Sequence, residues 1–347
     1  MRIAVNARVT AFSMGGQQRV TAEILKRLKD TDIIAPSRPL GGPEGHVWEQ
    51  FVLPARSAGR LLWSPSATGP IVKSFQVVTL HDIAFYDVPE FFSSTFRTFY
   101  GVITPPLMRR AARIATVSEF SRRRIIDRLG VPDDRIVVIP NGVTQSFRRH
   151  TLDEIAATRA ALSLPERYIL LQATADRRKN LSRAIAAWSE AQKSLPDDLM
   201  LVASGNLSRT HVFGDIGDIA NAPRTKLLGY VADEHMGPLL AGAEAFLFPS
   251  LYEGFGLPII EAMACGAPVL TADATATAEV AGGHAVLVDP HSTESIARGI
   301  VTIASDADLR ARLSAEGFGH AAKFTWDDAA GRYMRLFDEV IEERMRR

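Results

Sequence analysis

The chain has 347 residues, of which 46% are hydrophobic. This length is more than one ordinary domain core needs, so it predicts two domains. A single cysteine, Cys265, excludes an internal disulfide and a cysteine-based metal site, and favours a reducing compartment. No window approaches the ~18 unbroken apolar residues of a spanning helix, and the N-terminus lacks a secretory signal pattern, so we expect a soluble or peripheral protein.

The formal net charge is +1, but the charges are unevenly distributed along the chain. Residues 1–150 carry 21 Lys and Arg against 12 Asp and Glu, whereas residues 151–347 carry 19 against 27. Two explanations remain open. The arginines either form solvated helix faces, or they give the first half of the chain a different partner from the second.

Strand-like apolar runs alternate with helical patterns through the first half. The segment "QQRVTAEILKRLKD", residues 17–30, has helical spacing, with Val20, Ile24, Leu25 and Leu28 on one face. The alternation predicts βαβ units around a parallel sheet. The predicted strands are "RIAVNARV" (2–9), "SFQVVTL" (74–80), "RIATVS" (113–118) and "RIVVIP" (135–140).

A second series of predicted strands follows, so each half predicts a Rossmann-like, doubly wound α/β domain. We place the domains at residues 1–150 and 151–325, followed by a helix at about 326–347 with Trp326 near its start. Two such domains predict a central cleft lined by the carboxyl ends of their strands, where ligands bind. The second series is "RYILLQA" (167–173), "LMLVASG" (199–205), "TKLLGYV" (225–231), "EAFLFPS" (244–250), "APVLTA" (267–272) and "AVLVDP" (285–290). The apolar face of the last helix consists of Tyr333, Leu336, Phe337 and Val340.

The segment "SLYEGFGLPIIEAMACGAPVL", residues 250–270, predicts a turn followed by a short buried helix. Pro258 suits the first helical turn and Gly266 the position after the last one. The free N–H groups and the dipole at the start of such a helix attract phosphate. Glu261, one turn inside the helix, suits the two vicinal hydroxyls of a ribose, and Glu253 would meet whatever lies beyond the phosphates. The alternative is that both glutamates are solvated and the glycines only serve the turn.

Two loops follow the first strands of the two predicted domains. The loop "ATADRRKN" (173–180) places Lys179 at a loop-to-helix junction, where a mobile cation suits a diphosphate leaving group. The loop "SMGGQQRV" (13–20) contains Gly15 and Gly16, which permit close backbone approach. The G-x-G-x-x-G fingerprint is absent, which disfavours a nicotinamide enzyme.

The segment "VVTLHD" ends a predicted buried strand with His81 and Asp82 at its carboxyl end. His81 is placed to bond a sugar hydroxyl. Alternatively, Asp82 caps the next turn and His81 is a packed structural residue. No cluster of metal ligands is visible, so we expect activity without a metal or another cofactor, with Lys179 and the helix dipole stabilising the diphosphate.

Together these segments resemble the retaining glycosyltransferases of family four, which have the two-Rossmann GT-B fold. The resemblance spans nearly the whole chain, and its most specific element is the E-x7-E pattern of Glu253 and Glu261. It implies that the C-terminal helix crosses back to pack on the first domain. The segments that carry it are "PSLYEGFGLPIIEAMACGAPVL", "RRKNL", "LLGYVADEHMGPLLAGAEAFLFPS", "LHDIAFYDVPEFF", "ATVSEFSRRRI", "IPNGV" and "FTW".

The resemblance implies roles for residues of the second domain. Glu261 would hold the donor ribose, Glu253 the transferred sugar and Lys179 the diphosphate. Backbone groups of one loop would bind the sugar hydroxyls and the phosphate. Backbone groups of a second loop would flank the base. The residues of the first loop are Gly254, Phe255, Gly256 and Leu257, and those of the second are Gly229 and Tyr230.

The resemblance also implies that Gly16 lies under the phosphates and that His81 is the active-site histidine of the first domain. One family feature is missing. The arginine usually found five residues before the lysine is Thr174 here, so Arg178 or Arg19 would supply that charge.

The function implied is a retaining hexosyltransferase, with mannose from GDP-mannose favoured as the donor. The acceptor would be a glycan or a polyprenyl-diphosphate-linked oligosaccharide of polysaccharide assembly, and no nucleic acid is expected. The alternatives are a nucleotide-sugar 2-epimerase of the same fold and a non-catalytic nucleotide-sugar-binding protein. We expect a cytoplasmic protein at the inner face of the membrane, held by the basic segments 105–114 and 121–128. The alternative is that their arginines pair with Glu119, Asp127 and the acidic second domain, which would leave no free patch.

Overall fold

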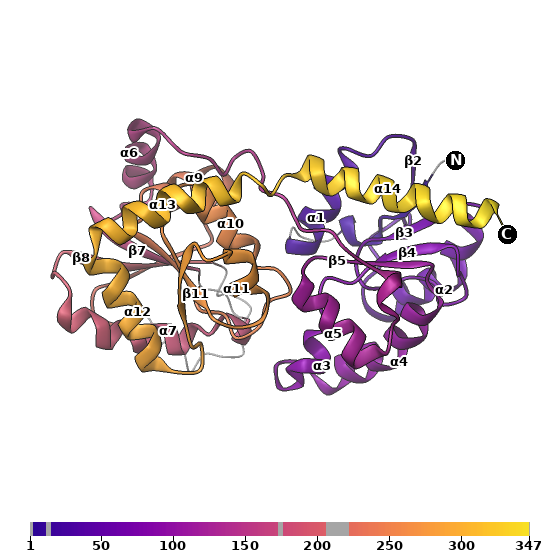
Figure 1. Cartoon of the computed structure of the whole chain (residues 1–347), viewed down its shortest axis with the longest axis horizontal. Coiled ribbons are helices and arrows are strands. Elements are labelled where there is room, and N and C mark those ends of the chain that lie inside the picture. The colour runs from indigo at the N-terminus through magenta and orange to yellow at the C-terminus, as the bar shows by residue number, and fades with distance from the viewer. Residues whose placement is uncertain (1–2, 12–14, 173–175, 206–221, 347) are drawn as a thin grey trace. The chain divides into compact units, whose positions relative to one another are not determined.

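The computed structural model describes residues 3–11, 15–172, 176–205 and 222–346. The chain divides into two compact units, Met1–Gly142 together with Thr325–Arg347, and Val143–Phe324. Each unit is built on one parallel sheet of six strands, with helices packed against it (Figure 1). The predicted class, two Rossmann-like α/β domains, is confirmed.

The sheet of the first unit has the strand order β2-β1-β3-β4-β5-β6, and every neighbouring pair is parallel. The central strands β3 and β4 are buried along their whole length, as expected for a parallel sheet that is covered on both faces. The bounds are β1 Ile3–Asn6, β2 Thr31–Ile34, β3 Leu62–Ser64, β4 Gln76–Thr79, β5 Arg113–Thr116 and β6 Ile136–Val138.

The helices of this unit begin and end at recognisable signals. The hydroxyls of Ser93 and Ser118 accept the N–H groups of Phe96 and Ser121, and so cap α4 and α5. Helix α1 ends at Leu25, earlier than predicted, because the chain turns there to enter β2. The bounds are η1 Arg8–Ala11, α1 Gly16–Leu25, α2 Gly42–Arg56, α3 Ala84–Asp87, η2 Pro89–Phe91, α4 Ser94–Arg110, α5 Glu119–Leu129, η3 Asp133–Arg135 and α14 Trp326–Met345.

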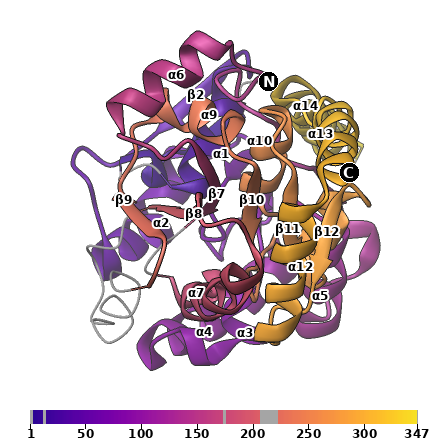
Figure 2. The same cartoon turned by 90° about the vertical axis from the view of Figure 1, so that its left-hand side faces the viewer.

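The sheet of the second unit has the order β12-β11-β10-β7-β8-β9, which Figure 2 shows running across the unit from right to left. All five strand pairs are parallel, so the carboxyl ends of the strands meet at one edge and the amino ends at the other. The bounds are β7 Arg167–Gln172, β8 Leu199–Ser204, β9 Thr225–Gly229, β10 Ala245–Phe248, β11 Val269–Ala272 and β12 Ala285–Val288.

Helices α7 and α12 pack against each other on one face of this sheet. Their apolar residues recur at helical spacing, and Trp188, Ile296 and Ile300 are removed from water. Each such side chain stabilises the unit by about 1.5–3 kcal/mol relative to exposure. The helices are α6 Leu152–Ala161, η4 Arg177–Lys179, α7 Leu181–Ala191, η5 Gln192–Ser194, α9 Asp233–Ala241, α10 Leu257–Ala264, α11 Thr275–Ala281, α12 Thr293–Ser305 and α13 Ala307–Ala321.

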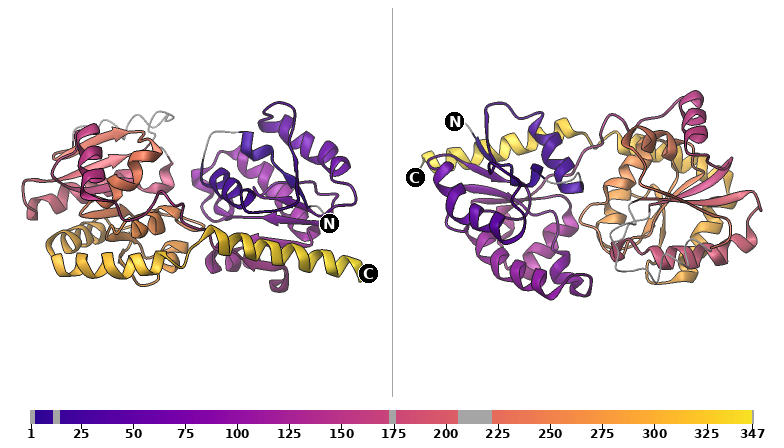
Figure 3. Two further views of the ribbon diagram at one scale, coloured as in Figure 1. Left: turned by 90° about the horizontal axis from the view of Figure 1, so that it is seen from above. Right: turned by 180° about the vertical axis from the view of Figure 1, so that it is seen from behind.

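The C-terminal helix α14 belongs to the first unit and lies along one side of it (Figure 3). Its buried face contains Tyr333 and Phe337, whose rings lie 5.1 and 5.8 Å from the ring of Trp63. The Tyr333 hydroxyl shares a 3.0 Å hydrogen bond with the Thr79 hydroxyl. Aromatic packing and this buried hydrogen bond therefore attach the end of the chain to β3 and β4.

The units divide after Gly142, eight residues before the predicted boundary at 150. The intervening residues pack within the second unit, where Phe147 is buried and the His150 ring lies against α9. Gly142 itself passes so close to α14 that an added Cβ would lie 2.2 Å from the Trp326 nitrogen. The sequence patterns placed the boundary at residue 150, but tertiary packing places residues 143–150 in the second unit.

Candidate functional site

The loop between β10 and α10 lies at the carboxyl edge of the second sheet. Gly256 ends it with φ of +94°, a conformation that favours glycine, and Pro258 lies in the first turn of α10. An added Cβ at Gly256 would also lie 3.0 Å from the Ile259 side chain. The loop therefore turns sharply into the helix. Pro258 has no N–H and the Ile259 N–H donates to the Gly256 carbonyl at 2.9 Å, so the helix end offers an anion its dipole and the Leu257 N–H, which has no intrahelical acceptor.

Lys179 and Glu253 meet at this edge. The Lys179 Nζ lies 2.6 Å from Glu253 Oε1, and the two side chains are 19% and 14% exposed. The ammonium also lies 4.8 Å from the centre of the Phe248 ring. Two residues that the sequence assigned to the diphosphate and the sugar are thus brought together from loops 74 positions apart.

Asn180 follows Lys179 directly, and no role was predicted for it from the sequence. It adopts φ of +61° and is buried, and its side-chain amide donates to the carbonyls of Pro249 and Pro290 at 3.0 and 2.7 Å. These bonds attach the end of η4 to the loops after β10 and β12. An Asn directly between a basic loop and a helical pattern is the signal that could have identified it.

Arg178, expected to replace a missing arginine, is bound to its own loop. Its guanidinium donates to Asp176 Oδ2 at 2.6 Å, while Asp176 Oδ1 accepts the Arg178 N–H at 3.0 Å. Burial would raise the pKa of Asp176, but the hydrogen bonds and charge of Arg178 lower it below its ordinary value. Arg178 therefore stabilises η4 in this structure. Thr174 lies outside the described residues.

Glu261 lies one turn inside α10, as predicted, and is only 7% exposed. Burial and the nearby Glu261 charge together raise the pKa of the Cys265 thiol to about 12. The thiol is therefore protonated at neutral pH. Because the Glu261 side chain is itself buried, the alternative that it is a solvated helix residue is wrong.

The other residues predicted to bind the donor differ in which of their groups are accessible to a ligand. Phe255 is buried with its ring 5.9 Å from that of Phe324, so only its backbone is available at the loop. Gly254 and Gly256 are buried beside it, and Leu257 is the first residue of α10. At the end of β9, Gly229 precedes Tyr230, whose side chain is 74% exposed.

His81 follows β4 at the carboxyl edge of the first sheet and is buried. Its Nε2 lies 2.9 Å from the Pro65 carbonyl, an acceptor, so Nε2 carries the hydrogen and Nδ1 has a free lone pair when the ring is neutral. Burial lowers the pKa of the ring, against the opposing effects of Pro65 and Asp82. Asp82 accepts the Ala84 N–H at 2.9 Å at the start of α3, which agrees with the structural explanation for this residue. The bond from His81 to a sugar hydroxyl stays a prediction.

Gly16 is the first residue of α1 and is exposed. An added Cβ there would meet nothing within 4 Å, so the fold itself does not require glycine at this position. Gly15 precedes it as the N-terminal cap of α1, and Arg19 lies one turn into the helix. The role implied for Gly16 stays a prediction.

The described residues contain no group of three His, Cys, Asp or Glu side chains that could hold a metal ion. Likewise, no helix within the described ranges is long and apolar enough to cross a membrane.

Several arginines of the predicted basic surface are ion-paired. Arg122 lies 2.6 Å from Asp133, and Arg124 and Arg128 lie 2.6 and 3.0 Å from Asp87. Glu119 and Asp127, the partners predicted, also lie 3.0 and 3.4 Å from Arg122 and Arg124. Pairing of the α5 arginines is therefore confirmed for these two residues, although the shorter contacts are to Asp87 and Asp133 of the same unit.

The sequence matches the protein families described as "Glycosyl transferases group 1", over residues 155–320, and "Glycosyltransferase Family 4", over residues 73–147. O-antigen chain mannosyltransferase B of Escherichia coli is 30% identical over 255 residues, which are 73% of this chain and 67% of that protein. Serotype-specific mannosyltransferase WbdA of Escherichia coli is 28% identical over 71% of this chain, a match that covers 31% of its own length. The crystal structure of Anabaena Alr3699/HepE with UDP and glucose has a TM-score of 0.76 at 20% identity, covering 98% of this chain and 100% of that one.

Proposed function

The chain belongs to glycosyltransferase family 4, and from this premise we propose that it transfers a hexose from a nucleotide sugar with retention of anomeric configuration. Its two six-stranded parallel sheets are the GT-B fold. The observation that carries the proposal is the pair of Lys179 and Glu253 beside the start of α10. A cation and the positive end of a helix dipole at one sheet edge suit a diphosphate.

Transfer breaks the bond between the sugar C1 and a diphosphate oxygen and forms a bond between C1 and an acceptor hydroxyl oxygen. The hydroxyl proton has to leave, and we propose that the departing diphosphate accepts it on the same face of the sugar. Lys179 and the N-terminus of α10 stabilise the negative charge that grows on this diphosphate. Reaction on a single face gives retention.

Glu253 has a second part in this proposal. In the structure its carboxylate neutralises Lys179, so neither charge is buried alone. A diphosphate would compete with Glu253 for the ammonium, because it also offers anionic oxygens. The released carboxylate would then accept hydrogen bonds from the hydroxyls of the donor sugar. Exchange of one ion pair for another leaves the Lys179 side chain paired with an anionic group throughout.

For the donor we propose GDP-mannose. Both E. coli relatives are named mannosyltransferases, which supports mannose. The Anabaena structure contains UDP and glucose but shares only 20% identity, so it supports the fold and not the base. The exposed Tyr230 offers an aromatic face on which either base could stack.

The test is nucleotide release from a panel of GDP-, UDP-, dTDP- and ADP-sugars. We expect release from GDP-mannose, loss in Lys179→Ala, and no change in Lys193→Ala, which removes an exposed lysine of the same unit. Release from none of the donors would contradict transferase activity. An epimerised donor formed without acceptor would instead support the epimerase alternative.

For the acceptor we propose a glycan or a polyprenyl-diphosphate-linked oligosaccharide, reached at the cytoplasmic face of the membrane. The O-antigen relative supports a polysaccharide acceptor. The excess of basic residues in residues 1–150 supports peripheral contact with anionic lipid, although the pairing of Arg122, Arg124 and Arg128 reduces the charge that α5 offers. Co-sedimentation with anionic vesicles that weakens at about 0.5 M salt would agree with this, and equal binding to neutral vesicles would contradict it.

A further inference from the structure

A pocket of about 480 Å³ lies at the amino edge of the first sheet. Phe75 and Arg113 line it at the starts of β4 and β5, and Arg135 lines it directly before β6. The C-terminal ends of α4 and α14 complete the wall. Because His81 follows β4 at the carboxyl edge, the pocket lies at the opposite edge of the first sheet from His81. Its basic residues are Arg109, Arg110, Arg113, Arg135 and Arg344.

The carboxylates of this pocket do not neutralise its arginines. The acidic residues that line it are Asp134 and Glu343, and of these Glu343 forms an ion pair with Arg113. Arg135 is occupied differently, since its guanidinium donates to carbonyls at the end of α4, including those of Met108 and Arg109 at 3.0 Å. Within the described part of the chain, three pocket arginines have no carboxylate partner: Arg109, Arg110 and Arg344.

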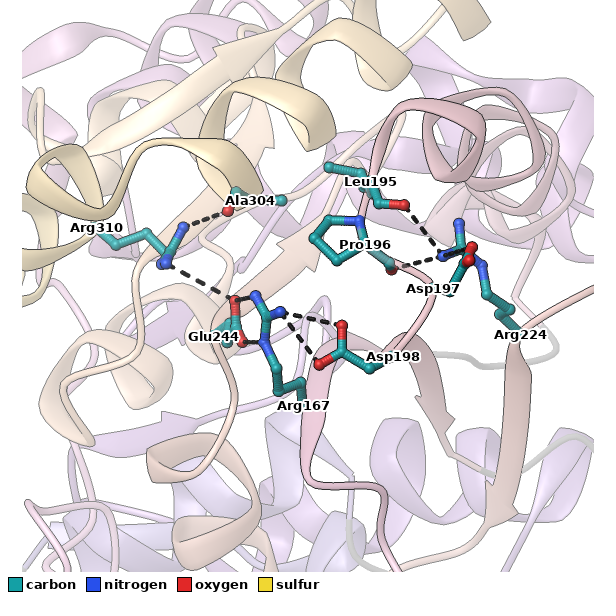
Figure 4. A network of polar contacts seen from close by, with 9 residues as sticks. All are labelled: Arg167, Leu195, Pro196, Asp197, Asp198, Arg224, Glu244, Ala304 and Arg310. Carbon is teal, nitrogen blue, oxygen red and sulfur yellow. Dashed lines mark hydrogen bonds and ion pairs between the residues drawn. The ribbon is translucent and has the colours of Figure 1, made fainter.

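The corresponding edge of the second sheet shows how this chain treats arginines elsewhere (Figure 4). Arg167 at the start of β7 lies 2.6 Å from Glu244 and 3.1 Å from Asp198. Arg310 lies 3.8 Å from Glu244, and Arg224 lies 3.6 Å from Asp197. Each of these three arginines has an acidic partner, unlike Arg109, Arg110 and Arg344 of the pocket.

The pocket arginines are also arranged in advance of any ligand. The Arg344 guanidinium carbon lies 4.6 Å from the centre of the Phe75 ring, which holds its plane. Arg110 donates to the Val72 carbonyl at 3.3 Å. Burial, followed by the charges of Arg344 and Arg60, lowers the pKa of Lys73, as expected beside a concentration of positive charge.

We propose that this pocket binds a phosphate-bearing anion, at a site separate from the donor site. Arginine presents a planar set of donors that matches phosphate oxygens in pairs, and three arginines without carboxylate partners supply it here. A pocket of this size accommodates a small phosphorylated molecule or the headgroup of an anionic lipid. By bridging α4 and α14, the anion would stabilise the attachment of the C-terminal helix to the first unit.

The experiment is calorimetric titration of inorganic pyrophosphate into the full chain carrying Lys179→Ala, which weakens the donor site. Any binding that remains at the start of α10 is common to all variants compared. The test variants add Arg109→Ala, Arg344→Ala or both. The matched control adds Arg123→Ala, an exposed arginine of the same unit that does not line the pocket. We expect binding that the double variant weakens by at least about tenfold and the control leaves unchanged.

Two outcomes would overturn the proposal: no binding of pyrophosphate or vesicles to the Lys179→Ala parent, or binding that Arg109→Ala and Arg344→Ala together leave unchanged. A second arm identifies the source of the phosphate, using phosphatidylglycerol vesicles with phosphatidylcholine vesicles as the neutral control. Binding to anionic vesicles that the double variant loses supports a lipid headgroup. Pyrophosphate binding without vesicle binding supports a soluble ligand. Neither arm measures turnover, so its result is independent of the proposed transferase activity.

Discussion

Two ion pairs of equal length lie at opposite edges of the second sheet. Lys179 and Glu253 meet at 2.6 Å at the carboxyl edge, and Arg167 and Glu244 meet at 2.6 Å at the amino edge (Figure 4). Their exposures are also similar, 19% and 14% against 34% and 20%. Length and burial therefore do not tell which of the two is functional.

The surroundings of the two pairs differ. Arg167 also binds Asp198, and Glu244 also meets Arg310, so each charge has two partners on the starts of strands and on α13. Such a network connects secondary structure elements and leaves nothing for a ligand to replace. Lys179, by contrast, has Glu253 as its one carboxylate partner among the described residues. Its partner Glu253 lies in the loop that leads into α10, so an anionic ligand has both a cation and a helix end to bind.

The sharpest test of this comparison is Lys179→Ala against Arg167→Ala. Because charge on the diphosphate grows as the sugar departs, we expect Lys179→Ala to lower kcat on the order of 10²-fold, more than it affects donor KM. Arg167→Ala should leave kcat and KM unchanged. Steady-state kinetics of purified variants measure this, and a similar loss in both would remove the distinction between the two edges.

A smaller effect is expected from Glu261→Ala, at the same edge as Lys179. Ribose contacts do not change during the reaction, so their loss weakens donor binding in the ground and transition states alike. We expect donor KM to rise about tenfold, the scale of losing hydrogen bonds to a charged group, with little change in kcat. The opposite pattern, a fall in kcat at constant KM, would show that the roles of Lys179 and Glu261 are misassigned.

At the amino edge, the expected effect is on stability. Arg167→Ala, Glu244→Ala and the double variant form a cycle whose coupling free energy of unfolding should be roughly 0.5–1 kcal/mol, since the pair is partly exposed and screened by solvent. Urea unfolding of the four proteins measures it. A coupling near zero would mean that the network of Figure 4 adds nothing to the stability of the sheet edge.

The loop that carries Lys179 should also depend on pH. The pKa of Asp176 lies below its ordinary value, so this carboxylate stabilises the folded state above the unfolded pKa of about 3.9 and loses that effect as pH falls through the folded pKa. We therefore expect Asp176→Asn to lower Tm at pH 7, and the difference from wild type to shrink below about pH 4. Thermal unfolding at both pH values checks this, and a constant difference would exclude the ion pair as its cause.

The smallest expected effect is that of a chelator. If Lys179 and the N-terminus of α10 stabilise the diphosphate, turnover should be unchanged in EDTA. Loss of activity in EDTA that Mn²⁺ restores would contradict this, and would mean that the Lys179–Glu253 pair is not sufficient for the leaving group.

The sequence by itself determined the α/β class, the two parallel sheets and the placement of Glu253, Lys179 and Glu261 near the ends of strands. These follow from local patterns, because apolar periodicity specifies strands and helices, and a Gly-rich turn before a proline specifies a helix start. The alternation of strands and helices makes the sheets parallel, and so places these loops at one edge.

Partners distant in the chain were decided only by the tertiary structure. Lys179 was expected to be available for phosphate, but it lies against Glu253, and Arg178 binds Asp176. Residues 143–150, polar in sequence, pack into the second unit. In the folded chain, arginines of α5 form ion pairs with Asp87 and Asp133. Arg109, Arg110 and Arg344 instead line a pocket. Ion pairing depends on distances of a few ångströms between side chains far apart in the chain, and a linear pattern of charges does not contain those distances.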